Sequence, residues 1–347
     1  MNNNTVRRFI TIGLIVLLGL IFVFTTDSFL TERNLFLLLR ESAYTGLIAL
    51  GIGTVIIGGG IDLSAGGIVC LVGVAAARAS FIPGIPGFAV ILIAVLAGAL
   101  CGLFNGLIVT KLHLSEFVTT LATGFVFNGL ALLTTFRVHG RVVSTPIKND
   151  SYLAFGGHVG SLFIITIFWL VLAVIMQIAL TRTKFGLHTA AQGANPKSAQ
   201  MSGVSGARIK ITGFVLCGSF CGLAAALVVA FQTGTTQALG NMMEFQAITA
   251  CVVGGVVMTG GKGDALAAFL GALFMTLVTN GLYKWGLSTG AMQVMYGLVI
   301  VVMTNFDAQF SRLTEGKSSG RRLKPVRTSR SNTISTADKT EKEIEND

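Results

Sequence analysis

Charged residues are scarce in this sequence. Asp, Glu, Lys and Arg together make up 12% of its 347 residues, about half the share found in soluble globular domains. Hydrophobic residues reach 52%, and 43 glycines add to the uncharged total. This composition excludes a soluble globule of this length, because such a fold needs more charged groups to cover its surface. It indicates a protein whose surface lies largely in contact with lipid.

The sequence also lacks the signatures of two energy sources. No G-x-x-x-x-G-K-[ST] string occurs, which excludes a phosphate-binding loop of the Walker A type. Ion-driven carriers keep acidic residues near the centre of the bilayer. Here the charged residues of the apolar region fall at or beside the predicted span ends: Asp62, Glu116, Glu244, Lys262 and Asp264. If the chain moves a solute uphill, another subunit therefore supplies the energy.

A cluster of metal ligands is not evident either. The four histidines are scattered over predicted loops and helix ends, and the five cysteines lie in apolar segments: Cys70, Cys101, Cys217, Cys221 and Cys251. Cys217 and Cys221 share a helix face, but no histidine or second cysteine pair accompanies them. We expect the cysteines to be small core residues, and the chain to carry no metal, no cofactor and no catalytic residue.

Apolar stretches follow one another along most of the chain. They predict an all-α polytopic membrane protein with about ten transmembrane helices, over residues 9–24, 46–60, 66–80, 88–110, 115–135, 161–180, 211–232, 245–259, 265–283 and 291–306. Several stretches are shorter than the roughly 20 residues that cross the hydrocarbon core. The pairs 46–60 with 66–80 and 245–259 with 265–283 can each be a broken or re-entrant helix instead. Eight crossings are therefore the alternative.

Positive charges set the predicted orientation. The formal net charge is +10, and with ten crossings 18 of the 25 Lys and Arg residues fall on one side, nine of them after residue 310. Positive residues gather on the cytoplasmic side of membrane proteins. The N- and C-termini are therefore predicted to be cytoplasmic and the protein to lie in the cell inner (plasma) membrane. Because the charge is explained by topology, no nucleic-acid partner is needed.

The two ends of the chain differ in composition. The first apolar stretch follows Arg7 and Arg8 and precedes no small-x-small cleavage site, so it predicts a retained first helix. Residues 1–310 are the predicted transmembrane domain. Residues 311–347 hold too few apolar residues to fold alone and predict a disordered cytoplasmic tail. The basic half of this tail can lie on anionic membrane lipid, or it can simply be solvated and enforce the topology.

Glycine is concentrated in the predicted spans. Gly98, Gly102 and Gly106 recur at four-residue spacing, which leaves a bare stripe where another helix can approach closely. The strings GAL at 98–100 and NGL at 105–107 also recur at 271–273 and 280–282. The two copies lie five spans apart and hence in opposite orientation, which favours an inverted repeat. Aligning Asp62 with Asp264 would give parallel halves instead.

The basic loop 181–210 contains signals for a short helix. Asn195 is a good N-cap, Pro196 fits the first helical position, and Gly203 sits where a C-terminal glycine belongs. They predict a two-turn helix over 196–202, isolated between polar turns. Such a helix is too short to be stable alone in water. It is either a connector held by its own bundle or a segment held by a partner, and the residues alone favour neither.

The run GGGIDLSAGG at 58–67 predicts a break between two helices. Three glycines ending at Gly60 interrupt the first helix, and Asp62 or Ser64 can cap the second. The expected structure is a helix-turn-helix at a membrane face. Asp62 is then either a cap or a residue that takes part in transport or coupling. A similar run, GGKGD, separates two predicted spans at 260–264.

Three segments together resemble the ribose-type sugar permeases, the membrane subunits of bacterial ABC importers for monosaccharides. They are GIDLSAGG at 60–67, AAQGANPKSAQMSGVSGARIKI at 190–211, and GGKGDALAAFLGALF at 260–274 followed by NGLYKWGLS at 280–288. The resemblance covers about residues 30–310. It implies two permease subunits, identical or paralogous, two ABC ATPase subunits that bind ATP, and a periplasmic sugar-binding protein.

The resemblance also implies roles for particular residues. The segment with Asn195, Pro196, Ala199 and Gly203 corresponds to the coupling segment that inserts into a groove of the ATPase. This chain departs from the family's usual pattern at Ala194, where glycine is common, and at Gln246, where aspartate is common. The second departure leaves the identity of the sugar open.

Two other functions compete with the sugar importer. One is an ABC permease for another small solute, such as autoinducer-2, a nucleoside or an amino acid. The other is a stand-alone ion-coupled secondary carrier in which Asp62 and Glu116 bind the ion; a passive facilitator or membrane scaffold is a third possibility. The leading hypothesis is the permease subunit of an ABC importer for a monosaccharide, without enzymatic activity of its own.

Overall fold

Helices form nearly all of the regular structure in the computed structural model. It describes residues 3–135, 137–138, 141–142, 145–236, 238–288, 290–299, 301–302 and 305. The chain divides into two units, Met1–Asp307 and Ala308–Asp347. The second unit lies outside the described residues, and so does the tail predicted over 311–347.

The helices follow the predicted apolar stretches closely in most places. They are α1 (Asn3–Thr25), α2 (Glu32–Ile57), α3 (Ala65–Ala79), α4 (Gly87–Lys111), α5 (Glu116–Thr134), α6 (Asp150–Leu153), α7 (Ile164–Arg182), α8 (Lys184–Ala194), α9 (Pro196–Met201), α10 (Gly206–Gln232), α11 (Met243–Gly254), α12 (Ala265–Lys284) and a last helix, Gly290–Val299. Among the described residues, seven helices are long and apolar enough to cross a membrane, namely α1, α2, α4, α5, α7, α10 and α12. Three shorter apolar helices accompany them: α3, α11 and Gly290–Val299.

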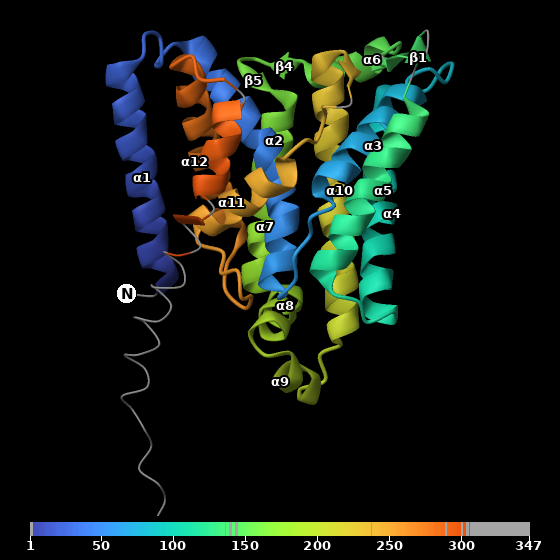
Figure 1. The fold of residues 1–347 in the computed structure, drawn as a ribbon, viewed down its shortest axis with the longest axis vertical. Coiled ribbons are helices and arrows are strands. Elements are labelled where there is room, and N and C mark those ends of the chain that lie inside the picture. The colour runs from blue at the N-terminus through green and yellow to red at the C-terminus, as the bar shows by residue number, and fades with distance from the viewer. Residues whose placement is uncertain are drawn as a thin grey trace, which may run out of the picture. The chain divides into compact units, whose positions relative to one another are not determined.

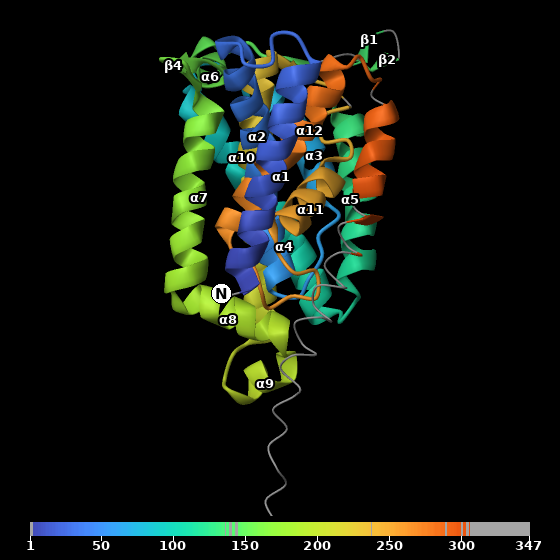
Figure 2. The same ribbon diagram turned by 90° about the vertical axis from the view of Figure 1, so that its left-hand side faces the viewer.

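The few strands are two residues long and lie in the connections. β1 (Arg137–Val138) pairs with β2 (Arg141–Val142), β3 (Thr145–Pro146) with β6 (Gly234–Thr235), and β4 (His158–Val159) with β5 (Leu162–Phe163), each pair antiparallel. A 3₁₀ turn covers Ala154–Gly156. Labelled strands and α6 lie at one end of the bundle, whereas α8, α9 and the N-terminus lie at the other (Figures 1 and 2). We call these the α6 end and the α9 end.

α2 begins well before its predicted position. The sequence predicted a span over 46–60, but the helix starts at Glu32. The earlier turns were missed because Arg40 and Glu41 interrupt the apolar run. In the structure these two side chains form an ion pair, and the Arg40 guanidinium lies over the Phe231 ring at 3.9 Å. Pairing and stacking of this kind allow a charged group to remain in a largely apolar helix.

α3 and α11 are too short to cross a bilayer alone. They have 15 and 12 residues, or about 22 Å and 18 Å of helix at 1.5 Å per residue. After α2, the chain turns at the α9 end and runs back as an extended strand-like segment before α3 starts partway along the bundle (Figure 1). α11 likewise lies within the bundle, and a loop reaches towards the α9 end before α12 begins (Figure 1). Both pairs that the sequence marked as possible broken helices are thus interrupted inside the fold.

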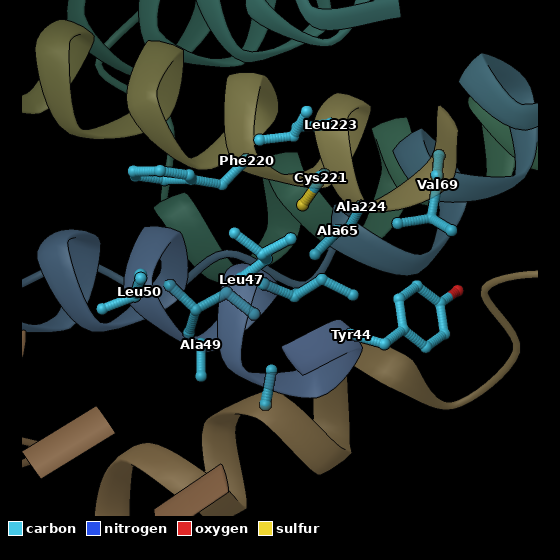
Figure 3. Close-up of a cluster of buried hydrophobic side chains, with 14 of the residues drawn as sticks. Tyr44, Leu47, Ala49, Leu50, Ala65, Val69, Phe220, Cys221, Leu223 and Ala224 are labelled. Carbon is cyan, nitrogen blue, oxygen red and sulfur yellow. The ribbon is translucent and has the colours of Figure 1, made fainter. Parts of the chain in front are cut away.

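The core lies where α2, α3 and α10 meet. Figure 3 shows Leu47 of α2, Ala65 of α3 and Cys221 of α10 close together there. The side chains at this junction are mostly small, and Ala65, Cys221 and Ala224 are fully buried. Small residues bring helix backbones close together, which increases van der Waals contact where lipid offers no hydrophobic driving force.

The glycine stripe of α4 faces α10. A Cβ atom added at Gly98 would overlap the Gly218 carbonyl oxygen, and one at Gly102 would overlap the Phe214 carbonyl oxygen. At Gly106 the added atom would lie 2.9 Å from the Ile211 Cα atom. The two helix backbones are therefore in direct contact over three turns, which explains why this face has no side chains.

α4 and α12, which carry the two GAL and NGL strings, run in opposite directions. α4 runs from the α6 end to the α9 end, and α12 runs the other way (Figure 1). Each is preceded by one of the short helices, α3 and α11 respectively. A short helix followed by a long one therefore occurs twice, and the two long helices run in opposite directions through the bundle.

Candidate functional site

The loop after α7 forms a helical elbow at the α9 end. α7 ends at Arg182 and α8 begins at Lys184, so the chain turns within one residue. The turn requires a glycine, because a Cβ atom at Gly186 would overlap the backbone of Leu180. The sequence predicted polar turns on both sides of a short helix, and this was wrong on the N-terminal side. The eleven residues of α8 precede α9 directly, and they hold it away from the bundle (Figure 2).

α9 has the local chemistry expected from its sequence. The Asn195 side-chain oxygen accepts a hydrogen bond from the Ser198 backbone N–H at 3.1 Å, and Pro196 occupies the first turn. Gly203 follows the helix with φ +82°, a left-handed conformation that favours glycine. The Val204 N–H donates to the Ala199 carbonyl at 3.0 Å and closes the end. The helix predicted over 196–202 is α9, at Pro196–Met201.

The two faces of α9 differ in exposure. Ala199 is only 4% exposed and packs against the protein itself. Met201, by contrast, is 90% exposed, and Leu187 on α8 is 68% exposed. No atom lies within 4 Å of a Cβ position at Gly203. Met201 and the Gly203 turn therefore belong to the surface available to a partner, together with the exposed Lys197 and Gln200, and Ala199 packs behind that surface.

The end of α8 meets both glycine-rich turns of the bundle. A Cβ atom at Gly260 would lie 2.8 Å from the Gly59 Cα atom and 3.1 Å from the Gly193 Cα atom. Gly59 and Gly260 have φ values of +85° and +84°. The Gly261 N–H donates to the Ile57 carbonyl at 2.9 Å. We call Gly59, Gly193, Gly260 and Gly261 the glycine junction. It joins the elbow to the segment between α2 and α3 and to the segment between α11 and α12.

The run at 58–67 only partly lies where the sequence predicted it. Gly60 is near the α9 end, beside Glu116, but Asp62 and Ser64 are 0% exposed and lie inside the bundle. These two residues are thus enclosed by helices, and their place at a membrane face stays a prediction. Ser64 is the N-cap residue of α3, yet its side chain makes no capping bond. The sequence could not reveal this, because the extended return between the helices depends on packing against α5 and α10.

Asp62 organises the start of α3 by a local network. Its Oδ1 atom accepts hydrogen bonds from the Ser64 N–H at 2.9 Å and the Ser64 hydroxyl at 2.6 Å. The Asn105 amide, from α4, donates to the Ser64 hydroxyl at 2.7 Å. The extended segment is also held from α5, since the Leu63 N–H donates to the Thr120 hydroxyl at 3.0 Å. These bonds satisfy backbone groups that would otherwise be stranded in an apolar interior.

Glu116, the other acid considered as an ion ligand, is engaged in structural contacts. Its Oε1 atom lies 2.6 Å from the Lys210 ammonium group. Its Oε2 atom accepts a hydrogen bond from the Ile61 N–H at 3.2 Å. The carboxylate thus links α5 to α10 and to the extended segment before α3. Both oxygens have partners within the protein, which does not favour a role in binding a coupling ion.

Asp264 begins α12 and connects it to α1. Its Oδ1 atom accepts a hydrogen bond from the Ala267 N–H at 3.0 Å, which is the geometry of an N-cap. Its Oδ2 atom forms an ion pair with Arg8. Nearby, the Thr11 hydroxyl donates to the Val253 carbonyl at 2.8 Å. The second glycine-rich turn is thus tied to the first helix of the chain.

Sequence reasoning missed a cavity of about 500 Å³ towards the α6 end. Its wall includes Arg40 and Glu41 of α2, Gln246 of α11 and Asn280 of α12. The charged pair within an apolar run was the one local signal of it. The remaining wall residues come from helices far apart in sequence, so spacing could not bring them together.

Long apolar helices, two broken helix pairs and a helical elbow define a multi-pass membrane permease. The chain belongs to the family described as "Branched-chain amino acid transport system / permease component", whose family model matches residues 34–304. This agrees with the architecture, because the match covers α2 to the last helix, including both glycine-rich turns.

Similar proteins include sugar importers from several bacteria. The chain is 33% identical to the ribose import permease protein of Bacillus subtilis over 86% of its length and 92% of that protein. It is 32% identical to the galactose/methyl galactoside import permease protein of Haemophilus influenzae, over 85% of this chain and 92% of the relative. The ribose import permease protein of Escherichia coli gives the same three values. No solved structure matches. The resemblance to ribose-type sugar permeases is thereby confirmed.

Proposed function

We propose that this protein is the membrane-spanning subunit of an ABC importer that takes up a monosaccharide delivered by a periplasmic binding protein. The assignment of a monosaccharide as the solute is supported by the similarity to ribose and galactose/methyl galactoside import permeases. ATP is bound and hydrolysed on a separate ATPase subunit, and this chain carries no cofactor and catalyses no reaction. A second permease subunit, identical or paralogous, completes the pathway.

The observation that carries this proposal is the glycine junction. An element docked by an ATPase must pass its movement to the pathway, and here the α8–α9 elbow touches both interrupted segments of the bundle. At Gly59, Gly193 and Gly260 the backbones are in contact without intervening side chains. A shift of α8 would therefore move the α2–α3 and α11–α12 connections together. Such direct contact suits the transmission of a rigid-body movement.

The proposed cycle follows from this contact. The ATPase engages the exposed Met201 and Gly203 surface of α9. Closure of the ATPase dimer pulls on the elbow, and the glycine junction shifts the extended segments that precede α3 and α12. Because the Asp62 network fixes the start of α3 to α4 and α5, the shift is passed to these helices. The two permease subunits then alternate between outward-open and inward-open forms.

The topology belongs to the same proposal. The seven long helices and the three shorter ones make ten crossings, in which α3 and α11 each cross together with the extended chain beside them. The α9 end is cytoplasmic, so both termini are cytoplasmic and the protein lies in the inner membrane. The opposite directions of α4 and α12, each preceded by a short helix, support an inverted repeat.

The docking surface can be tested at Met201, since Ala199 is buried and its replacement would disturb folding. The chain is reconstituted in liposomes with its ATPase and binding protein. Met201→Glu, with Met201→Leu as the control, should reduce both ribose or galactose uptake and the stimulation of ATP hydrolysis by loaded binding protein at least tenfold. Met201→Leu should retain most of both. Unchanged coupling in Met201→Glu would refute the assignment of α9.

The alternative functions make different predictions. In an ABC permease for autoinducer-2, a nucleoside or an amino acid, the same complex would import that solute and neither sugar. In an ion-coupled carrier, the isolated chain would transport without ATP and an uncoupler would stop it. The pairing of Glu116 with Lys210 and the Ile61 N–H disfavours the carrier.

A further inference from the structure

A cavity between α2, α11, α12 and the helix Gly290–Val299 has the size of a ligand site. Its volume is about 500 Å³, within the range of about 300–1,000 Å³ that is usual for small-molecule pockets. Tyr283, at the last turn of α12, lies on its wall. The next residue, Lys284, contacts the Ser28 carbonyl in the connection between α1 and α2. The cavity therefore lies in the half of the bundle that is remote from the α8–α9 elbow.

The wall of this cavity presents uncharged hydrogen-bonding groups from four helices. They are the Thr45 hydroxyl on α2, the Gln246 amide on α11, the Thr276, Thr279, Asn280 and Tyr283 side chains on α12, and the Tyr296 hydroxyl on the last helix. The Thr279 and Tyr296 hydroxyls are 3.0 Å apart. Asn280 is oriented by a pair of hydrogen bonds with Asn34, at 3.2 Å and 3.3 Å. The polar groups are thus positioned by neighbours, and tyrosine rings supply flat apolar surface beside them.

The charged residues on the wall neutralise each other. Arg40 forms an ion pair with the adjacent Glu41, and the Arg40 guanidinium also lies over the rings of Phe231 and Phe163, at 3.9 Å and 5.2 Å. Among the described residues of the wall, these are the charged ones. A zwitterionic amino acid would have to break this pair to gain partners for its own charges. A neutral molecule with several hydroxyl groups needs no such exchange.

A second cavity adjoins the first at Arg40. It has a volume of about 460 Å³, and its wall includes Glu32, Arg33 and His158. Leu37 and Arg40 belong to the walls of both cavities. Since β4, which contains His158, lies at the α6 end (Figure 1), the second cavity is the outer one. A solute entering at that end passes Arg40 before it reaches Gln246.

We propose that the inner cavity is the site at which the permease itself holds a monosaccharide during transport, with Gln246 and Thr279 as hydrogen-bonding residues and Arg40 at its entrance. This inference rests on the proposed function and adds to it the residues that contact the sugar. The tyrosine rings and the amide groups match the apolar faces and hydroxyl groups of a sugar ring. We expect the affinity of this site for the sugar to be low, because a transport site must release what it binds.

The test uses threonines on two helices as a matched pair. Thr279→Val removes a hydroxyl group from the cavity wall. Thr249→Val makes the same change on α11, at a buried hydroxyl that donates to its own helix at Phe245 and is not part of the wall. Gln246→Leu removes an amide of similar size from the wall. Each variant is reconstituted as the full complex with ATPase and binding protein, and both sugar uptake and ATP hydrolysis are measured with ribose and with galactose.

The expected result is a loss of sugar imported per ATP hydrolysed. Loss of one hydrogen bond to the sugar corresponds to roughly a three- to tenfold effect. Thr279→Val and Gln246→Leu should lower the ratio by that factor and keep the stimulation of ATP hydrolysis by loaded binding protein. Thr249→Val should match the wild type in both. A merely structural role would lower uptake and hydrolysis together and leave the ratio unchanged.

Failure of this inference differs from failure of the proposed function. If the wild-type complex imports ribose or galactose and both wall variants keep the wild-type ratio, the cavity is not the sugar site, and the importer assignment stands. If the wild-type complex imports neither sugar but imports leucine with ATP, both the sugar assignment and the sugar site are overturned.

Discussion

At the scale of single residues, glycine allows backbone segments of this protein to approach closely, in addition to making the chain more flexible. Gly193 lies in a regular helix, where glycine costs about 0.5–1 kcal/mol relative to alanine. Close packing leaves no room for a side chain here. A Cβ atom at this position would overlap the Ile57 carbonyl oxygen and approach the Gly261 nitrogen. One added methyl group would thus press on both glycine-rich turns at once.

We therefore predict that Gly193→Ala uncouples the elbow from the bundle. The added methyl group should separate α8 from Gly59 and Gly261 and cost about 1–3 kcal/mol through overpacking. Coupled sugar uptake should fall at least tenfold, and thermal unfolding in detergent should occur at a lower temperature. Gly129→Ala on α5 is the control, since no atom lies within 4 Å of its Cβ position. Equal sugar uptake and equal unfolding temperatures in the two variants would show that the glycine junction does not couple the elbow to the bundle.

Residues with local signals were predictable, and residues defined by distant contacts were not. Asn195, Pro196 and Gly203 mark α9 because capping depends on neighbours along the chain. The burial of Asp62 was not predictable, because the sequence does not show that the chain turns back into the bundle after Gly60. Gln246 stood out in the sequence only as a departure from the family's pattern, and its place on a cavity wall needed three other helices.

At the scale of elements, the two interrupted helix pairs are built with similar chemistry. Each short helix is linked to a long one through glycines and an aspartate, but the aspartates act differently. Asp62 bonds to Ser64 before the short helix α3, whereas Asp264 caps the long helix α12 and pairs with Arg8. The apolar pattern predicted both breaks. It could not predict their partners, since Arg8 is 256 positions away from Asp264.

The two roles of Asp264 can be separated by substitution. Asp264→Asn keeps a good N-cap and loses the ion pair with Arg8, whereas Asp264→Ala loses both. We expect Asp264→Ala to be the less stable variant by about 1 kcal/mol, the usual value of an N-cap. The difference is measured by thermal unfolding of the purified protein in detergent. Equal unfolding temperatures of Asp264→Ala and Asp264→Asn would show that the cap contributes nothing.

At the scale of the whole molecule, the bundle has two functionally different ends. The α9 end holds the elbow, the glycine junction and the N-terminus, and the α6 end holds the connections beside the outer cavity. The inner cavity is lined by α2, α11 and α12, the helices whose connections meet at the glycine junction, and the outer cavity shares α2 with it. A movement applied at one end is thus carried by the helices that form the walls at the other. The sequence predicted the long helices that make this possible, but apart from the charged pair Arg40 and Glu41 it gave no sign of the cavities between them.

The orientation of the molecule follows from the proposed docking of the ATPase on α9, and it can be measured with a matched pair of cysteines. Ser202→Cys places a thiol beside α9 and Ser161→Cys places one between β4 and β5; both serines are exposed. Four native cysteines are buried, and the half-buried Cys101 is replaced by alanine to lower the background. In intact cells a membrane-impermeant maleimide should label Ser161→Cys and leave Ser202→Cys unlabelled, and permeabilised cells should label both. The reverse pattern would place the elbow outside the cell, where no ATPase can reach it, and would refute the proposed direction of coupling.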